Sequence, residues 1–369
     1  MSLIPENIAI YSVGLLGGSI GLALKNSGFK GKIMGLSSPE NIRIAQDLGC
    51  IDEGYSYEKL QDVVSDCNLI FLCSPINSII KSIETLGKLK LHDNLIITDV
   101  GSTKNAIVSA AIKALPSNIH FIGGHPMTGS EKSGPSASDP YLFQNAIYVI
   151  TPQNGEPDSL HKEFALFLEK YLGCRTLFLN PSIHDRIAAT VSHLPHILAV
   201  TLVNLAQSVE SQIPGTLTLA AGGFRDMTRI ASAPYSMWHD ILSTNKTAVE
   251  PLIDSFINLL SEIKLQLKND SLSDAFNQSR QTRSRIPSSN KGFIHTLSEI
   301  LVIAKDQPGF IASLTRTLAE KNINIKDIEV MKVREGEGGT IRLAFESPVI
   351  ASEAVSVLIK NGFSARERT

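Results

Sequence analysis

Cysteine and tryptophan are scarce in this chain of 369 residues, which has four cysteines and one tryptophan. The cysteines lie far apart in the sequence, without the short paired spacing of zinc or iron–sulfur motifs, and this pattern argues against a disulfide framework. We therefore expect no metal site and a reducing, cytoplasmic location. The four residues are Cys50, Cys67, Cys73 and Cys174.

The chain also lacks an excess of charge, since its formal net charge is −2. Without a basic field, we expect neither nucleic acid nor anionic lipid as a partner. One uncharged run, residues 7–24, approaches the length of a membrane span. Because Glu6 rather than a basic cluster precedes this run, and glycines interrupt it, we interpret it as a buried first strand and helix and expect no membrane partner.

Apolar residues make up 43% of the chain, and its length predicts two to three domains. Over residues 1–180, short apolar runs alternate with amphipathic stretches. This alternation predicts an α/β, Rossmann-type domain with a mostly parallel sheet. The predicted strands are Ile8–Val13, Ile33–Leu36, Leu69–Cys73, Leu95–Thr98, His120–Gly123 and Ala146–Ile150.

Two further regions follow along the chain. Residues 181–285 predict an all-α domain with long helices over Ile187–Gln207 and Met237–Leu267. A polar segment leads into a linker at 286–296. Residues 297–369 then predict a strand, a helix, two strands, a helix and a closing strand, which is a small βαββαβ, ferredoxin-like unit.

A glycine-rich turn follows the first predicted strand and precedes a helix. In this position, backbone N–H groups and the helix N-terminus can bind a pyrophosphate, so the turn predicts a dinucleotide site. The usual fingerprint begins with a glycine where this chain has Ser12, and the turn could instead be merely a tight strand-to-helix connection. The candidate cofactor-binding residues are Gly14, Leu15, Leu16, Gly17 and Gly18.

The end of the second strand bears on the choice of cofactor. NAD-binding domains usually have an acidic residue there for the ribose 2′-hydroxyl, whereas this chain has Ser37 and Ser38. Both hydroxyls could donate to a 2′-phosphate. We therefore expect NAD as cofactor and leave NADP open.

Two later strands end in polar motifs at the edge of the sheet where ligands bind. After the fourth strand, Ser102 either caps the next helix or contacts a substrate hydroxyl, and one serine can do both. The fifth strand delivers His125, which can take a proton from an alcohol near neutral pH, and Glu131 follows in the same loop.

The helical region contributes further candidates. His193 and His196 share a helix face, but no acidic partner has metal-ligand spacing, and Pro195 is expected to bend this helix. Asp226 and Arg229 are three residues apart, so they form either a structural ion pair or a carboxylate that orients a guanidinium toward an anionic substrate.

Five motifs and one tryptophan, taken together and in this order, resemble the prephenate dehydrogenase family of tyrosine biosynthesis. The resemblance extends to about Pro287. Beyond it, Asp306, Pro308 and Gly309 form a turn that looks like that of an ACT domain, a module that senses amino acids. The motifs are GLLGGSIG, DVGSTK, GGHPMTGSE, HDRIAATVSHLPH and GGFRDMTRIA, with Trp238 nine residues beyond Arg229.

This resemblance implies oxidative decarboxylation of prephenate to 4-hydroxyphenylpyruvate, with His125 accepting the proton of the C4 hydroxyl and Ser102 hydrogen-bonded to that hydroxyl. It also implies a homodimer interlocked through the helical domain, and tyrosine as the effector of the ACT domain, with Asp306, Pro308 and Gly309 in its site. The implied substrate-binding residues are Arg229 for a carboxylate, Asp226 as its orienting partner, His193, Trp238 as an aromatic wall, and Glu131.

The chain departs from the common family residues at Ser12, Ser37, Ser38 and Thr128. Glu131 favours prephenate over arogenate as substrate, because members that prefer arogenate can lack this acid. Two different functions stay open at this point. One is a hydroxyacid dehydrogenase of the 6-phosphogluconate type, for which only Lys246 could serve as catalytic lysine. The second is a non-catalytic regulator that senses nucleotides and amino acids.

Overall fold

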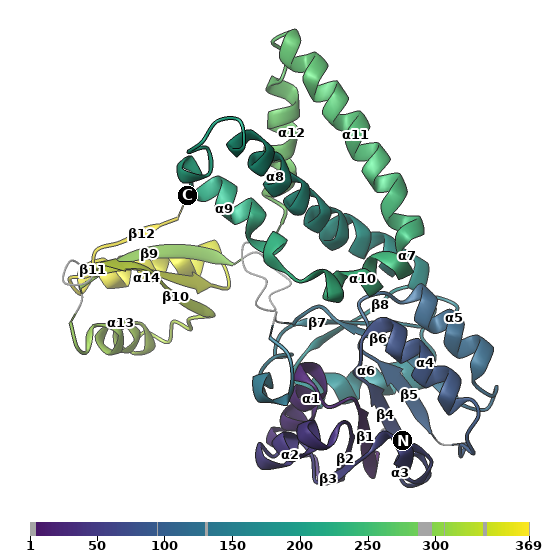
Figure 1. The fold of residues 1–369 in the computed structure, drawn as a ribbon. Helices are drawn as coiled ribbons and strands as arrows, with labels where there is room; N and C mark the ends of the chain where they lie inside the picture. The colour runs from purple at the N-terminus through teal and green to yellow at the C-terminus, as the bar shows by residue number, and fades with distance from the viewer. Residues whose placement is uncertain are drawn as a thin grey trace. The chain divides into compact units, whose positions relative to one another are not determined.

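A computed structural model describes residues 5–93, 95–129, 132–286, 297–305, 307–334 and 338–368. The chain divides into two compact units, residues 1–271 and 272–369, and each is described by itself. The first unit contains a large sheet and a set of long helices, and the second contains a small sheet (Figure 1). The predicted domain boundary at 285 stays a prediction.

An eight-stranded sheet organises the first unit, with strand order β3-β2-β1-β4-β5-β6-β7-β8. Adjacent strands pair in parallel except β6 and β7, which are antiparallel. The predicted parallel α/β sheet is thus confirmed, although β3 and β8 were not predicted. The strands are Asn7–Tyr11, Lys32–Leu36, Glu53–Tyr55, Leu69–Leu72, Ile96–Asp99, His120–Pro126, Ile147–Thr151 and Arg175–Phe178.

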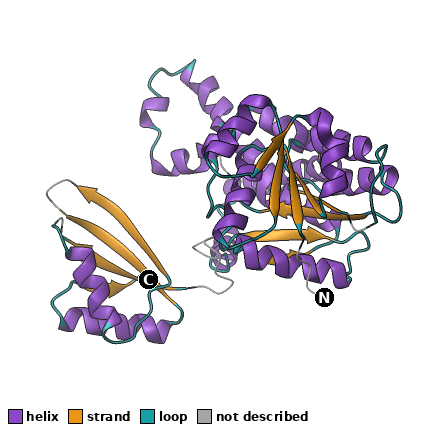
Figure 2. Ribbon diagram, turned by 90° about the horizontal axis from the view of Figure 1, so that it is seen from below, coloured by secondary structure: helices purple, strands orange, loops and turns teal. Residues whose placement is uncertain are grey.

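Helices cover both faces of this sheet (Figure 2). Because successive strand residues point to opposite faces, Ile8 and Ile10 join one apolar core and Ala9 joins the other. Residues of α1 and α6 pack in the first core, and residues of α3, α4 and α5 pack in the second. The helices are α1 Leu15–Asn26, α2 Pro39–Asp47, α3 Leu60–Asp66, α4 Ile76–Leu86, α5 Asn105–Ala114 and α6 Ser159–Leu172.

The rest of the first unit is helical, as predicted. A continuous helical run comprises α7, a π-helical turn over Ala189–His193, and α8. The predicted helix Met237–Leu267 is instead two helices, because the chain breaks at Asn245, whose φ is −118°. The helices are α7 Pro181–Ala188, α8 Leu194–Glu210, α9 Gly222–Thr228, α10 Tyr235–Thr244 and α11 Lys246–Lys268.

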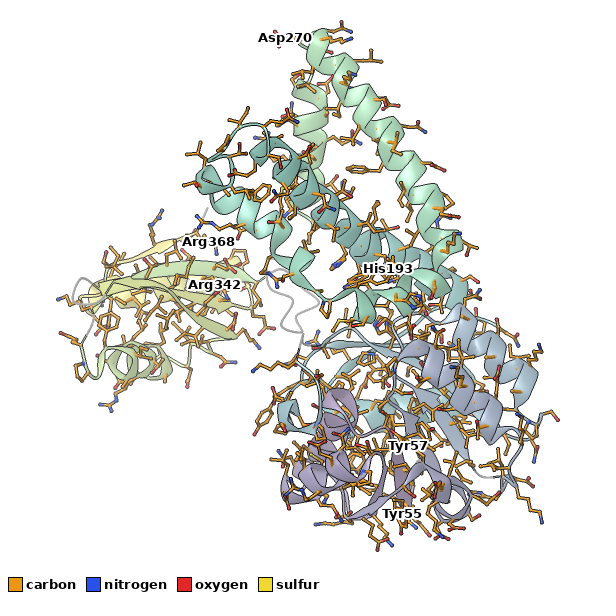
Figure 3. The ribbon with its side chains drawn as sticks, viewed as in Figure 1. Tyr55, Tyr57, His193, Asp270, Arg342 and Arg368 are labelled. Carbon is orange, nitrogen blue, oxygen red and sulfur yellow. The ribbon has the colours of Figure 1, made fainter. Side chains whose placement is uncertain are left out.

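The second unit confirms the predicted βαββαβ pattern. Its four-stranded antiparallel sheet has the order β10-β11-β9-β12, with its apolar core between the sheet and two helices. Arg342, only 4% exposed, forms ion pairs with Glu299, Asp327 and Glu329 (Figure 3). The predicted linker lies mostly outside the described residues. The elements are α12 Ser273–Arg283, β9 Ser298–Ala304, α13 Phe310–Ala319, β10 Asp327–Arg334, β11 Gly338–Phe345, α14 Pro348–Lys360 and β12 Ala365–Glu367.

Candidate active site

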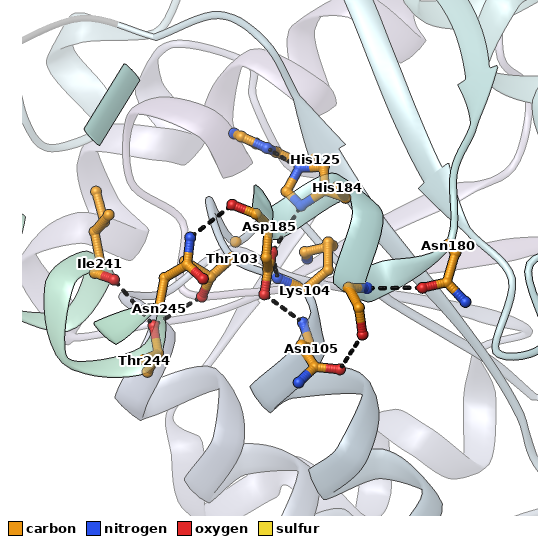
Figure 4. Close-up of polar contacts among 12 residues, drawn as sticks. Thr103, Lys104, Asn105, His125, Asn180, His184, Asp185, Ile241, Thr244 and Asn245 are labelled. Atoms are coloured by element: carbon orange, nitrogen blue, oxygen red, sulfur yellow. Dashed lines mark hydrogen bonds and ion pairs between the residues drawn. The ribbon is translucent and has the colours of Figure 1, made fainter. Parts of the chain in front are cut away.

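The predicted base, His125, lies near the end of β6, and two residues of α7 approach it from the helical region (Figure 4). Nδ1 of His125 is 2.8 Å from Nε2 of His184. Nδ1 of His184 is in turn 2.8 Å from a carboxylate oxygen of Asp185. His184 and Asp185 are buried. The three side chains therefore form one hydrogen-bonded chain between the helical region and the sheet edge.

The carboxylate sets the direction of these hydrogen bonds. A carboxylate can only accept, so Nδ1 of His184 donates to Asp185. In the His184 tautomer that has its proton on Nδ1, Nε2 accepts and Nδ1 of His125 is the donor. This arrangement leaves Nε2 of His125 without a proton, which is the form that a general base needs.

The surroundings also keep His125 uncharged. Burial lowers the pKa of His125 well below its ordinary value, and the nearby His184, Lys104 and His193 lower this pKa further. A neutral imidazole is thus available at pH values at which an exposed histidine would be partly protonated.

Asp185 also caps the start of α5. Its two carboxylate oxygens accept the backbone N–H groups of Lys104 at 2.7 Å and Asn105 at 2.9 Å. No side chain at the N-cap position of α5 provides a cap. The expectation that Ser102 caps this helix is wrong, because the helix begins at Asn105 and Asp185 binds the exposed N–H groups. Ser102 is half-buried in the turn between β5 and α5.

A fully buried ion pair spans the same turn. Asp99, at the end of β5, pairs with Lys104, just before α5, and both side chains are completely buried. Burial raises the pKa of Asp99 and lowers that of Lys104, while their mutual attraction opposes both shifts.

His193 lies in the π-helical turn (Figure 3). Pro195, which has no backbone N–H, follows two residues later, and π turns are frequent at functional sites. Nδ2 of Asn245 donates to Nδ1 of His193 at 3.1 Å and to the carbonyl oxygen of Asp185 at 2.8 Å. Burial lowers the pKa of His193 to about 4, so the neutral ring presents Nε2–H as a donor.

Trp238 packs between two histidines of the helical region. Its ring stacks on His196 with centroids 3.7 Å apart and meets His193 edge-on at 6.0 Å. Trp238 and His196 line a pocket of about 440 Å³ together with Gly129, from the loop that follows His125. The predicted aromatic wall therefore faces a pocket that also includes the loop of the base.

The two residues of the predicted carboxylate-binding pair lie in successive elements of the helical region. Arg229 begins a short 3-10 helix and Asp226 lies on α9, and both residues are exposed. The structure describes both residues, and the orienting role of Asp226 stays a prediction. Glu131 lies outside the described residues.

The glycine turn fits a dinucleotide. A Cβ atom at Gly14 would meet no atom within 4 Å, so open space lies in front of α1, and no side chain caps this helix. Its uncapped N–H groups, including those near Leu15 and Leu16, suit a pyrophosphate. An added Cβ at Gly17 would lie 2.8 Å from the carbonyl oxygen of Ser12, and one at Gly18 would overlap Oγ of Ser138, so these glycines permit close packing.

The two serines after β2 have partners within the chain. Oγ of Ser38 caps α2 by accepting the N–H of Asn41 at 3.4 Å. Ser37 is buried, and its hydroxyl accepts from the Asn41 side chain at 3.4 Å. Glu40 adds a negative charge in the first turn of the same helix.

In the second unit, part of the predicted effector turn is described. Gly309 has a φ of +84° at the N-terminus of α13, a conformation that favours glycine, and Pro308 precedes it. Asp306 lies outside the described residues.

Sequence reasoning missed the residues that orient the base. His184 and Asp185 belong to a recognised motif, but the sequence gives no sign of their role, because their partners are about 60 and 80 residues away in the chain. Asn245 falls inside a predicted helix, and Asp99 and Lys104 are visible only as parts of a motif. A helix start without its own cap, as at Lys104, is the one signal that could have pointed to Asp185.

Comparison with known proteins now decides the family. Residues 20–174 match the nucleotide-binding domain of prephenate dehydrogenase, and residues 180–279 match its dimerization domain. The chain belongs to the prephenate dehydrogenase family. Residues 298–354 match the ACT domain.

Individual relatives agree with this membership. The chain is 34% identical to prephenate dehydrogenase of Bacillus subtilis (strain 168), over 94% of each chain. It is also 34% identical to prephenate dehydrogenase of Lactococcus lactis subsp. cremoris, over 96% of this chain and 98% of the relative. The crystal structure of prephenate dehydrogenase from Aquifex aeolicus in complex with hydroxyphenyl propionate and NAD+ is similar, with a TM-score of 0.68 and 32% identity over 76% of this chain and 96% of that one.

These findings confirm the predicted class of enzyme, an NAD(P)-dependent prephenate dehydrogenase with an ACT domain. They also bear on one apolar helix. The run Pro181–Glu210 is long and apolar enough to cross a membrane, which alone is weak evidence, and only 28% of its most apolar window is buried. This run lies in the region that matches the dimerization domain.

Proposed function

We propose that this chain oxidatively decarboxylates prephenate to 4-hydroxyphenylpyruvate, with His125 as general base. The observation that carries the proposal is the chain of contacts from Asp185 through His184 to His125. The tautomers that the carboxylate favours leave Nε2 of His125 free to accept a proton. The hydroxyl at C4 of prephenate is the proton donor that this nitrogen would meet.

The residues of the chain then have the following roles. His125 takes the hydroxyl proton, and the resulting imidazolium donates to His184, which Asp185 holds in place. Ser102 hydrogen-bonds to the same hydroxyl. NAD+, bound at the glycine turn, would accept the hydride from C4 as the ring carboxylate leaves as CO2 and the ring becomes aromatic.

Most of the substrate-binding residues come from the helical region. Arg229 binds a carboxylate of prephenate, because a guanidinium makes charge-assisted, bidentate bonds to such groups, and Asp226 orients it. Trp238 supplies an apolar wall to the ring, and the Nε2–H of His193 serves as a donor on the substrate side. Glu131 favours prephenate, which has no amine on its side chain, over arogenate.

We infer that NAD+ is preferred to NADP+. A 2′-phosphate at the end of β2 would lie near the first turn of α2, where Glu40 adds a negative charge. Lys32 lies at the opposite end of β2. Ser37 is buried, so Ser38 alone would remain for a phosphate oxygen.

The assembly and its regulation complete the proposal. The chain forms a homodimer through its helical region, and tyrosine binds at the turn that includes Asp306, Pro308 and Gly309 and lowers activity. The cytoplasmic location predicted from the cysteines stays a prediction.

Initial rates at 340 nm with prephenate and arogenate, each offered with NAD+ and NADP+, test the proposal. We expect the highest turnover with prephenate and NAD+. His125→Asn should lower kcat by about 10² to 10⁴ while NAD+ still binds, the range expected when a positioned base is lost. Unchanged turnover would remove His125 from the mechanism, and faster turnover of arogenate would reassign the substrate.

A further inference from the structure

The motif residues Asp99 and Lys104 have no role in the mechanism above, although both are completely buried at the edge that carries His125. Their contacts converge on Gly124, the residue before the base. Oδ1 of Asp99 accepts the N–H of Gly124 at 3.1 Å, and Nζ of Lys104 donates to its carbonyl oxygen at 2.7 Å. Both polar backbone atoms of Gly124 are therefore held by one ion pair.

These contacts begin where the backbone pairing between β5 and β6 ends. Backbone pairing between β5 and β6 runs from Ile96 and His120 to Thr98 and Ile122. At Gly124, two side chains take over the bonding on the β5 side. No side chain could be accommodated at Gly124 itself, since a Cβ would lie 2.7 Å from the carbonyl oxygen of Asp99 and 2.8 Å from the Tyr148 ring.

We propose that Asp99 and Lys104 act as positioning residues, an ion-pair clamp on Gly124 that fixes the main chain of His125. This inference rests on the proposed role of His125 as base. Small displacements of a reacting group are costly to turnover, so a clamp on the adjacent peptide has a direct kinetic consequence.

Lys104 also acts on the charge of the base. Its positive charge disfavours protonation of His125, and we expect the negative charge of Asp99, its buried partner, to oppose that effect. Among the residues that the structure describes, His184 and His193 also act on His125, and Asp185 is linked to it through His184. These groups are unchanged in the variants below.

The test is the pH profile of kcat/KM for the full-length enzyme with prephenate and NAD+. Lys104→Met should raise the apparent pKa on the acidic side of this profile, its acid limb, by about one unit. Asp99→Asn should lower the same apparent pKa by a similar amount. Both variants should also lose about tenfold or more in kcat. The double variant Asp99→Asn/Lys104→Met should return the limb to within about 0.3 units of the parent while kcat stays low, because the charges cancel but the clamp is gone.

Controls separate this inference from misfolding and from failure of the proposed function. The single tryptophan reports folding, and NAD+ titration reports the nucleotide site. Lys59→Met removes an exposed ion pair with Asp62 and should leave rate and profile unchanged. Should a single variant fail to fold, the double variant alone decides, since parental kcat in it overturns the clamp.

Identical acid limbs in all folded variants, or shifts of the same sign, would also overturn the inference. If instead His125→Asn retains full turnover, the proposed base fails and the clamp with it. Loss of turnover in His125→Asn with unchanged kinetics in the clamp variants removes only the clamp.

Discussion

The sheet region and the helical region of the first unit differ in how much apolar surface they bury within one chain. Strands β1 and β4 are buried along most of their length between two apolar cores. In contrast, the buried apolar residues described between 190 and 271 are only Ala199 and Val249. Large side chains there are exposed, including Leu205 at 61% and Ile213 at 62%. The sheet region buries its apolar surface within one chain, whereas the helical region leaves much of its apolar surface exposed.

The candidate active site takes residues from both the sheet region and the helical region. His125 lies on the sheet, but His184, Asp185 and Asn245, which direct its hydrogen bonds and those of His193, come from the helices. The sheet region thus carries the base, and the helical region supplies the residues that orient its ring. The following predictions test that division, from the largest expected effect to the smallest.

Breaking the link between the regions at Asp185 should have the largest effect. In Asp185→Asn, the amide can donate to Nδ1 of His184, which reverses the hydrogen bonds and places the proton on Nε2 of His125. We expect kcat to fall by about 10² to 10⁴, as for a base in the wrong tautomer. Steady-state kinetics at pH 7 provide the measurement.

Asp240→Asn is the matched control. Asp240 also comes from the helical region and accepts the N–H of Asn77 at the start of α4, at 3.0 Å. No hydrogen bond among the described residues links it to His125 or His184. Its loss should cost about 1 kcal/mol of stability and less than tenfold in kcat. Equal losses of kcat in the two variants would mean that docking of the regions, not the tautomer, is what matters.

Charge on the exposed helical surface should dissociate the dimer. Leu205→Asp buries a charge at the expected interface and should weaken self-association by about 100-fold. Light scattering over a concentration series gives the mass. Leu166→Asp is the counterpart on α6 of the sheet region, where Leu166 is 65% exposed. It should leave the mass unchanged, and a parental mass for Leu205→Asp would exclude this part of α8 from the interface.

Acid should weaken the fold through His193. The pKa of this residue is about 4 when folded, below the 6.5 of an ordinary histidine, so its contribution to stability is complete above pH 6.5 and is lost as the pH falls toward 4. Between pH 6.5 and 5, the unfolding free energy should drop by about 2 kcal/mol more in the parent than in His193→Gln. Urea unfolding at both pH values measures this difference. His239→Gln, at an exposed histidine, should behave as the parent.

Relief of strain in the glycine turn is the smallest effect. Ser12 has a φ of +73°, which costs a residue with a Cβ about 1 kcal/mol, so Ser12→Gly should stabilise the protein by about 0.5 to 1 kcal/mol. Thermal unfolding gives the value. Asn145→Gly, at a φ of +62°, should gain less, because asparagine tolerates this conformation better. A destabilised Ser12→Gly would show that the serine hydroxyl has a structural role that outweighs the strain.

Local patterns in the sequence were sufficient for most of the fold. The alternation of apolar runs predicted six strands of the sheet, and the order of elements predicted the small ferredoxin-like unit, because both depend on side-chain periodicity. The short strands Glu53–Tyr55 and Arg175–Phe178 were missed, since three or four half-buried residues form no period. The break at Asn245 was missed because its cause is a pair of distant acceptors.

By itself, the sequence determined the chemical groups of this protein: a glycine turn, a histidine at the end of a strand, and the motifs of a known family. Only the tertiary structure decided how these groups are connected. It assigned the cap of α5 to Asp185 rather than Ser102 and the orientation of His125 to His184. The physical reason is that periodicity acts between neighbours along the chain, whereas a hydrogen bond depends on atoms brought within about 3 Å by folding.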